Sequence, residues 1–326
     1  MADYGVPMAA GKAAWRLCAA WTAAVVCWAP VASADLGDVV GVVEIGSGRA
    51  LFVECRGTGS PTVILMAGKG NGADDWLQVL APEDPEHAAS GDNLPWGFGD
   101  LVHSSAAVLP SVARFTRVCA YDRPDVRVDG ADISTARNQP HTVDLDVHDL
   151  QALLAALGEP DPYVLVAHSY SGVIADLYAR THPQTVAGLV MVDAVTEQIA
   201  DVVGPAALTT WDATNAETTP QVHEGVHLID AFSRIDAAPP LPAVPAVVLS
   251  ADKPWRTDLL PAEATRGAQV TFADWLAAQN LLATALGAEH VTDTHSGHDI
   301  YLYNPALVVK AIHEVVRAAS PAGAPP

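Results

Sequence analysis

Short runs of β-branched and apolar residues alternate along this chain with longer segments whose apolar residues recur at helical spacing. Such alternation is typical of α/β proteins with a mostly parallel sheet. Residues 39–45 and 50–54 flank the turn sequence Gly46-Ser47-Gly48 and predict an antiparallel hairpin. Further apolar runs predict buried strands at residues 62–67, 117–121, 163–167, 188–192 and 246–250.

Three segments have the periodicity of amphipathic helices. Leucines recur at helical spacing within residues 142–157, and Gly158 follows as a stop signal. A second helix is predicted at residues 171–180, directly after a buried strand, and a third at residues 308–318. The Ala-, Pro- and Gly-rich residues 321–326 predict a flexible tail.

Two segments interrupt the alternation of strands and helices. Residues 80–109 are rich in Pro, Gly and Asp and predict a long loop with short helices. Residues 196–245 are weakly periodic and end in a proline-rich stretch. Because this second segment separates two core strands, we expect it to form a small lid. Four of its side chains are candidates for the wall of a substrate site: Trp211, His223, His227 and Phe232.

The N-terminus has the pattern of a secretory signal peptide. Lys12 and Arg16 precede an apolar stretch at residues 17–29, and Ala32-Ser33-Ala34 fits the small-residue cleavage rule. Cleavage after Ala34 would make Asp35 the first residue of an exported protein. The apolar stretch is shorter than the roughly 20 residues that span a bilayer, so we expect no stable membrane anchor.

Composition excludes two classes of function. The 326 residues carry 17 basic and 38 acidic side chains, a net charge of −21, which would repel nucleic acid. The four cysteines contain no C-x-x-C pair, so a structural zinc is not expected, nor is any other metal site. Only Cys55 and Cys119 would remain after removal of the signal peptide.

The clearest chemical signal lies where the strand at residues 163–167 runs into a helix. Ser169 stands at this turn, with the small residues Ala167 and Ser171 two positions away on either side. A nucleophile at such a turn has a strained backbone, and its neighbours must be small because strand and helix pass close together. The usual neighbours are glycines, so the pattern departs from the common motif at both positions.

Further short motifs occur along the chain before and after this turn. They are Leu65-Met66-Ala67-Gly68-Lys69, Tyr121-Asp122-Arg123, Leu189-Val190-Met191-Val192-Asp193, Ser296-Gly297-His298 and Asn304-Pro305. With these motifs and the turn at Ser169, the chain resembles the α/β-hydrolase superfamily over nearly all of residues 39–318, and within it the esterase-like enzymes. The resemblance implies one domain at residues 35–320, with a mostly parallel eight-stranded sheet, helices on both faces and a lid insertion at about residues 196–245. It also implies a Ser–acid–His triad in that order.

Family resemblance assigns the other triad members. His298, in a Ser-Gly-His turn before the last helix, is the expected base, in preference to His290 and His295. The acid has two candidate positions, each after a core strand. We favour Asp193 slightly, and Asp252 remains the alternative.

The oxyanion hole requires backbone N–H groups. The resemblance implies that Tyr170, directly after Ser169, supplies one donor and that Lys69, beside Gly68, supplies the other. The glycine-rich residues 68–72 could alternatively hold a phosphate, but they lack the spacing of known phosphate loops.

The resemblance also makes the strands of Cys55 and Cys119 neighbours in the sheet. Export would then favour a disulfide between them over two free thiols.

These features together predict a secreted serine hydrolase of small-molecule carboxylic esters that needs no cofactor. Two alternatives stay open: a hydrolase of amide or peptide bonds, and a non-catalytic binding protein on the same fold. A serine at position 169 argues against dehalogenase or epoxide hydrolase chemistry, for which the superfamily uses an aspartate there.

Overall fold

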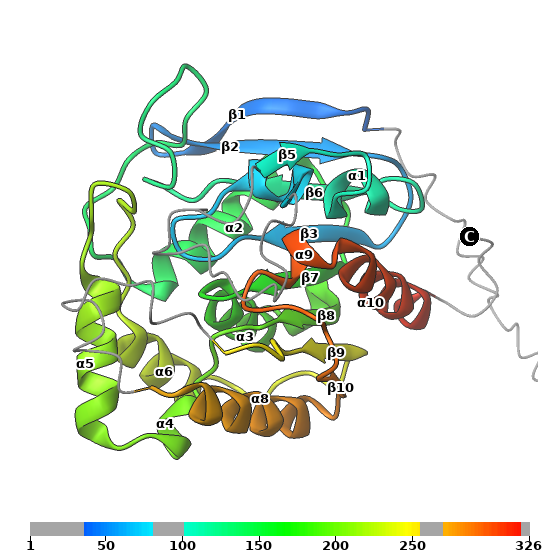
Figure 1. The fold of residues 1–326 in the computed structure, drawn as a ribbon. Coiled ribbons are helices and arrows are strands. Elements are labelled where there is room, and N and C mark those ends of the chain that lie inside the picture. Colours follow the sequence, from blue (N-terminus) through cyan, green and yellow to red (C-terminus); the bar gives the residue numbers. More distant parts are fainter. Residues whose placement is uncertain (1–35, 81–100, 255–269, 321–326) are drawn as a thin grey trace, which may run out of the picture. The chain divides into compact units, whose positions relative to one another are not determined.

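An eight-stranded sheet forms the centre of the structure, a computed structural model that describes residues 36–80, 101–254 and 270–320. Its strand order is β1-β2-β6-β3-β7-β8-β9-β10 (Figure 1). β2 pairs antiparallel with β1 and β6, and the remaining pairings are parallel, as predicted. The strands are β1 (Val39–Gly46), β2 (Arg49–Arg56), β3 (Thr62–Met66), β6 (Val118–Tyr121), β7 (Tyr163–His168), β8 (Val186–Val192), β9 (Ala246–Leu249) and β10 (Glu289–Val291).

The predicted hairpin of β1 and β2 is present. Gly46, Ser47 and Gly48 have φ values of 91°, 57° and 69°, so three consecutive residues adopt the left-handed region. Glycine enters this region without steric cost, which explains why two of the three turn residues are glycines.

Helices cover both faces of the sheet. The central strands are buried on both sides, and alternate residues of β7 contribute to different hydrophobic clusters: Leu165 to one, Val164 and Val166 to the other. The first cluster is completed by α2 (Val143–Leu157), α3 (Ser171–Thr181), α6 (Leu228–Asp236) and α8 (Phe272–Leu286). The second is completed by α1 (Val108–Val112), α9 (Ile300–Tyr303) and α10 (Pro305–Ala319), seen at the front of Figure 1.

The helix α8 and the strand β10 are absent from the prediction. Both ends of α8 nevertheless carry local sequence signals. The side chain of Thr271 accepts the N–H of Asp274, and the carboxylate of Asp274 accepts the N–H of Thr271, which caps the start of the helix. Gly287, with φ 58°, ends it.

The two irregular segments contain short elements. Before and after residues 81–100, which the structure does not describe, lie η1 (Ala73–Leu77), β4 (Gln78–Leu80) and β5 (Leu101–His103). A second 3₁₀ helix, η2 (Pro183–Thr185), precedes β8. The insertion at residues 196–245 holds α4 (Ile199–Val202), α5 (Pro205–Ala216) and α6. None of the α5 side chains is fully buried, which explains the weak periodicity of this segment.

Cys55 of β2 and Cys119 of β6 lie directly opposite each other in the antiparallel register. Their Sγ atoms are 2.07 Å apart, at disulfide distance, and both side chains are buried. The predicted adjacency of the two strands is confirmed. The bond attaches the N-terminal hairpin to the parallel part of the sheet.

Two predicted segments lie outside the described residues: the signal peptide at residues 1–34 and the tail at residues 321–326. Among the helices that the structure does describe, we find none with the length and apolar character needed to cross a bilayer.

Loss of the disulfide should destabilise the protein. The bond closes a separation of 64 residues, for which the chain-entropy model gives about 4 kcal/mol of free energy of unfolding. We expect the Cys55→Ser/Cys119→Ser variant to unfold at lower urea concentration than the wild type. In a strong reductant the two proteins should unfold alike. A persistent difference there would assign the effect to the serines and not to the bond.

Candidate active site

Ser169 lies in the sharp turn between β7 and α3. Its backbone φ is 51°, in a region that costs a non-glycine residue about 1–3 kcal/mol and persists only where the surrounding structure fixes it. Only 5% of Ser169 is exposed. This strained backbone is the one expected of a nucleophile elbow.

Close packing explains which residues of the turn must be small. A Cβ atom on Gly172 would lie 2.3 Å from the backbone oxygen of Val195, so no side chain fits there. Ser171 is fully buried, and its Oγ donates to the backbone oxygen of Ala67 at 2.5 Å. The glycine requirement is therefore met at Gly172, and Ser171 is accommodated because its hydroxyl has an acceptor.

His298 lies on the loop between β10 and α9 and binds Asp193. The Nδ1 atom of His298 is 2.7 Å from Oδ2 of Asp193, and both side chains are buried. Asp193 directly follows β8, the strand beside β7, so its carboxylate lies at the same end of the sheet as Ser169. Of the two candidate acids, Asp193 is the one in contact with the imidazole.

Trp275 of α8 also binds Asp193. Its Nε1 donates to Oδ1 of Asp193 at 2.8 Å, and the backbone N–H of Ala251 donates to the same oxygen at 2.9 Å. The indole ring meets the imidazole of His298 edge-on, with 5.9 Å between ring centroids. Hydrogen bonds on both oxygens fix the plane of the carboxylate. Trp275 is absent from the predicted site residues because α8 is absent from the predicted helices.

Asp252, the alternative acid, has a different place. Its carboxylate accepts the backbone N–H groups of His295 and Ser296, both at 3.0 Å. The backbone N–H of Asp252 donates in turn to the oxygen of Ser296 at 2.9 Å. Asp252, the alternative acid of the prediction, therefore binds the loop that carries His298, whereas the imidazole itself binds Asp193.

The two competing histidines point elsewhere. His290 lies in β10 with Nε2 2.7 Å from Oγ of Ser250 and Nδ1 3.0 Å from Oδ1 of Asn280. The side chain of His295 is 72% exposed.

His168, directly before Ser169, ties the turn to the loop of His298. Its Nε2 lies 3.1 Å from the backbone oxygen of His298, and the two rings pack with centroids 4.6 Å apart. Burial, and secondarily the charge of His298, lowers the pKa of His168 well below 6.5. His168 is therefore a neutral donor to that oxygen. His168 is not among the predicted site residues.

The backbone of both predicted oxyanion donors lies next to Ser169. A Cβ atom on Gly68 would come within 3.0 Å of the Cβ of Ser169, so the loop that continues into Lys69 passes directly over the serine. Tyr170 caps the N-terminus of α3, where backbone N–H groups have no partner within the helix.

Other N–H groups of the glycine-rich loop bind carboxylates of the protein. The N–H of Gly70 donates to Glu224 at 2.8 Å, and that of Gly72 donates to Asp75 at 2.7 Å. Because these donors already face anionic side chains, the loop is poorly suited to hold a phosphate.

The four candidate wall residues differ in position. The ring centroids of Trp211 and Trp275 lie 6.2 Å apart, and Trp275 in turn packs against His298. Phe232 lies on the buried face of α6, while His223 and His227 are partly buried in the insertion.

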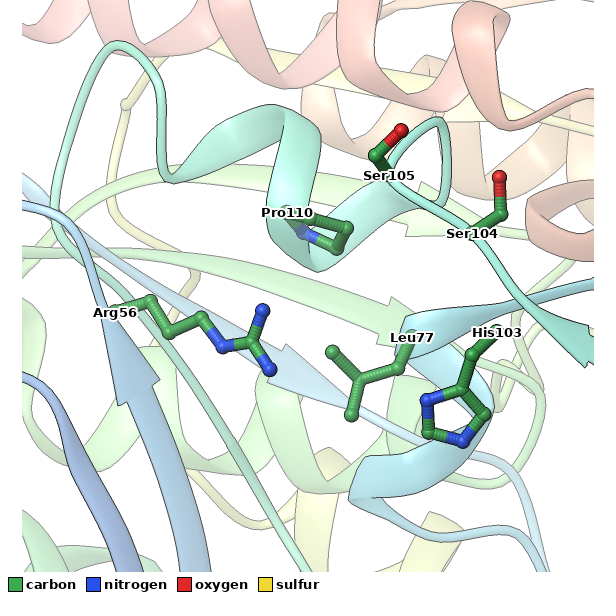
Figure 2. Close-up of a pocket in the computed structure, with 6 residues that line it drawn as sticks. All are labelled: Arg56, Leu77, His103, Ser104, Ser105 and Pro110. Carbon is green, nitrogen blue, oxygen red and sulfur yellow. The ribbon is translucent and has the colours of Figure 1, made fainter.

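A separate hollow of about 290 Å³ lies away from these residues. Figure 2 shows Arg56 and His103 on either side of Leu77 in this hollow. Its remaining lining residues are Ser104, Ser105 and Pro110. None of the predicted site residues is among the six, so the hollow is separate from the residues around Ser169.

Known proteins resemble this chain either in sequence or in fold. The uncharacterized protein YqjL of Bacillus subtilis (strain 168) is 25% identical over 280 residues, which cover 83% of this chain and 89% of YqjL. A thermophilic esterase from Thermogutta terrifontis has a similar fold, with a TM-score of 0.52 and 16% identity over 86% of this chain and 98% of the esterase. The N-acyl homoserine lactone degrading enzyme Est816 has a TM-score of 0.51 and 16% identity over 84% of this chain and all of its own.

At such low identity the two solved structures indicate the fold alone. A family model described as alpha/beta hydrolase fold matches residues 96–261, which is half of the chain and includes Ser169 and Asp193. The order of the eight strands and the matched segment lead to one conclusion: the chain belongs to the α/β-hydrolase fold family.

Proposed function

We propose that this protein is a serine hydrolase that cleaves carboxylic esters through an acyl-enzyme on Ser169. The observation that carries the proposal is the 2.7 Å hydrogen bond between His298 and Asp193 at the end of the sheet where Ser169 stands in a strained turn. A carboxylate on Nδ1 fixes the imidazole tautomer and leaves Nε2 to accept a proton.

In this mechanism Ser169 attacks the ester carbonyl while His298 accepts the proton of its hydroxyl. The imidazolium then gives this proton to the leaving alkoxide, and an acyl-enzyme remains. Water attacks the acyl-enzyme with His298 again acting as the base, and the carboxylate product leaves. The backbone N–H groups of Lys69 and Tyr170 stabilise the negative charge on the carbonyl oxygen.

A small neutral or cationic ester is the substrate class that fits best. The net charge of −21 disfavours polyanionic substrates. The esterase from Thermogutta terrifontis on the same fold supports ester cleavage by analogy. The ring of Trp211, in the insertion, packs against Trp275, and Trp275 packs against His298. The two tryptophans are therefore positioned to influence which substrates fit.

Replacement of Ser169 should abolish activity. We expect a fluorophosphonate probe to label the wild type, and the wild type to hydrolyse p-nitrophenyl acetate, whereas Ser169→Ala does neither because the attacking oxygen is gone. The matched control is Ser111→Ala. Ser111 is another buried serine, on the opposite face of the sheet, and the probe should label this variant as it labels the wild type.

The same assay separates the alternatives. A wild type that neither labels nor hydrolyses short p-nitrophenyl esters would contradict the proposal and favour a non-catalytic binding protein. Faster turnover of an aminoacyl-nitroanilide than of the esters would instead favour amide cleavage.

The two aspartates should differ in their effect on turnover. Asp193→Asn should lower kcat by about 10⁴-fold, by analogy with serine proteases, because the amide no longer holds the imidazole in the required tautomer. Asp252→Asn should cost much less, since its amide oxygen can still accept a backbone N–H from the loop of His298. Steady-state kinetics with p-nitrophenyl acetate measures both. An equal loss in the two variants would contradict the assignment of Asp193.

We further propose that the protein is exported and cut after Ala34, on the basis of the charged, apolar and small-residue pattern of residues 1–34. N-terminal sequencing of protein recovered outside the cytoplasm should begin at Asp35. Recovery of the full chain from the cytoplasm, with Cys55 and Cys119 reduced, would contradict export.

A further inference from the structure

Arg123, two residues after β6, is buried beneath the loop that follows β3. Its Nη1 donates to the backbone oxygen of Ala67 at 2.7 Å, and its Nη2 donates to the backbone oxygen of Gly68 at 2.6 Å. Nη1 also donates to Oγ of Ser171 at 3.0 Å. One guanidinium therefore joins the loop over Ser169 to the first turn of α3.

The contact with Gly68 has a direct consequence for Lys69. The oxygen of Gly68 and the N–H of Lys69 belong to the same trans peptide unit, so they point in opposite directions. A cation on the oxygen fixes the direction of this N–H and polarises it, because hydrogen bonds through one amide strengthen each other. The N–H of Lys69 is the oxyanion donor proposed above.

Arg123 also contacts the residue of the second donor. Its Cζ atom lies 5.4 Å from the ring centroid of Tyr170, within range of a cation–π interaction. The hydroxyl of Tyr170 donates to Asp146 at 2.7 Å, which holds the ring from its other end. The guanidinium thus contacts the ring of Tyr170 and the oxygen of the peptide unit that carries the N–H of Lys69.

Glu224 of the insertion holds Arg123 in this position. Its two carboxylate oxygens accept Nε and Nη2 of Arg123 at 2.7 and 2.9 Å, a bidentate pair with both side chains buried. Burial acts to lower the pKa of Arg123, but the charge and hydrogen bonds of Glu224, together with the charge of Asp146, outweigh it and the pKa is raised. The guanidinium therefore keeps its charge beneath the loop.

The insertion contacts the same loop at two further points. The backbone oxygen of Glu217 accepts Nζ of Lys69 at 3.2 Å. A Cβ atom on Gly70 would meet Val222 at 2.9 Å, so these residues are in close contact. Glu224 itself accepts the N–H of Gly70. The segment at residues 217–224 therefore borders the loop along its length.

We propose that Arg123 is a positioning residue that orients and polarises the oxyanion hole, and that Glu224 couples this hole to the lid insertion. The inference rests on the proposed ester hydrolysis. If the Arg123–Glu224 pair were purely structural, its loss would lower the stability of the fold but leave the transition state unaffected. If it orients the oxyanion hole, its loss would lower kcat even in a variant that remains folded.

The chain supplies a matched control for this distinction. Arg117, at the other end of β6, forms a second buried pair with Glu159, at 2.8 and 3.0 Å, and lies away from the candidate site. Arg117→Lys and Arg123→Lys make the same chemical change on either side of the same strand. Lysine keeps the charge in both but loses the planar fork.

Arg123→Lys should lower kcat on p-nitrophenyl acetate by on the order of 100-fold, as expected when the oxyanion donors are misplaced, with little change in KM. The inhibition constant of a trifluoromethyl ketone, which forms an oxyanion on the serine, should rise by the same factor. Arg117→Lys should retain the kcat of the wild type even where its melting temperature falls. Glu224→Gln should lose part of kcat, since a neutral amide holds the guanidinium less firmly.

Equal kcat in Arg123→Lys and Arg117→Lys would overturn the inference while leaving ester hydrolysis intact. Should Arg123→Lys fail to fold, Glu224→Gln decides the question alone: a kcat equal to that of the wild type overturns the inference, and a reduced kcat with unchanged KM supports it. A wild type without esterase activity would refute the proposed function, and the inference with it.

Discussion

The tight packing of the turn at Ser169 against the loop after β8 is the constraint on which the site depends. Gly172 meets the backbone of Val195, and the oxygen of Ser169 accepts the N–H of Val195 at 2.8 Å. The loop that closes on Ser169 in this way is the one that carries Asp193. These contacts with Val195 therefore fix the strained serine and place the carboxylate of Asp193 at the same end of the sheet.

Buried charge surrounds this turn, and each charged group near it has specific partners. Asp193 accepts donors on both of its oxygens, and Arg123 faces Glu224 across a bidentate contact. Charges removed from water are tolerated only when such partners are present. Their partners come from distant segments, with Glu224 and Trp275 both lying far along the chain from the groups they bind. The site is consequently a product of the complete fold and not of one motif.

Local patterns in the sequence predict the frame of this molecule well. The hairpin, the buried strands and the helix that ends at Gly158 follow from alternation, β-branched runs and a glycine stop, all of which act over a few residues. Arg123 stands in a recognised motif, yet its partner Glu224 comes from a weakly periodic insertion, and no local pattern links the two. Trp275 lies on a helix rich in alanine and leucine. Its sequence does not show which face is buried, because that depends on how the helix packs against the sheet. The choice between Asp193 and Asp252 likewise required the path of the loop that carries His298.

The position of the disulfide has a topological consequence. Cys55 lies before the β4–β5 segment and Cys119 lies after it, so the bond bridges everything that stands between β2 and β6. If a peptidase cut the chain once anywhere in that interval, the two fragments would still be one covalent molecule. The N-terminal fragment would keep its hairpin paired in register with β6, the strand that leads to Arg123. Between the two cysteines, therefore, a single cut of the chain would release no fragment.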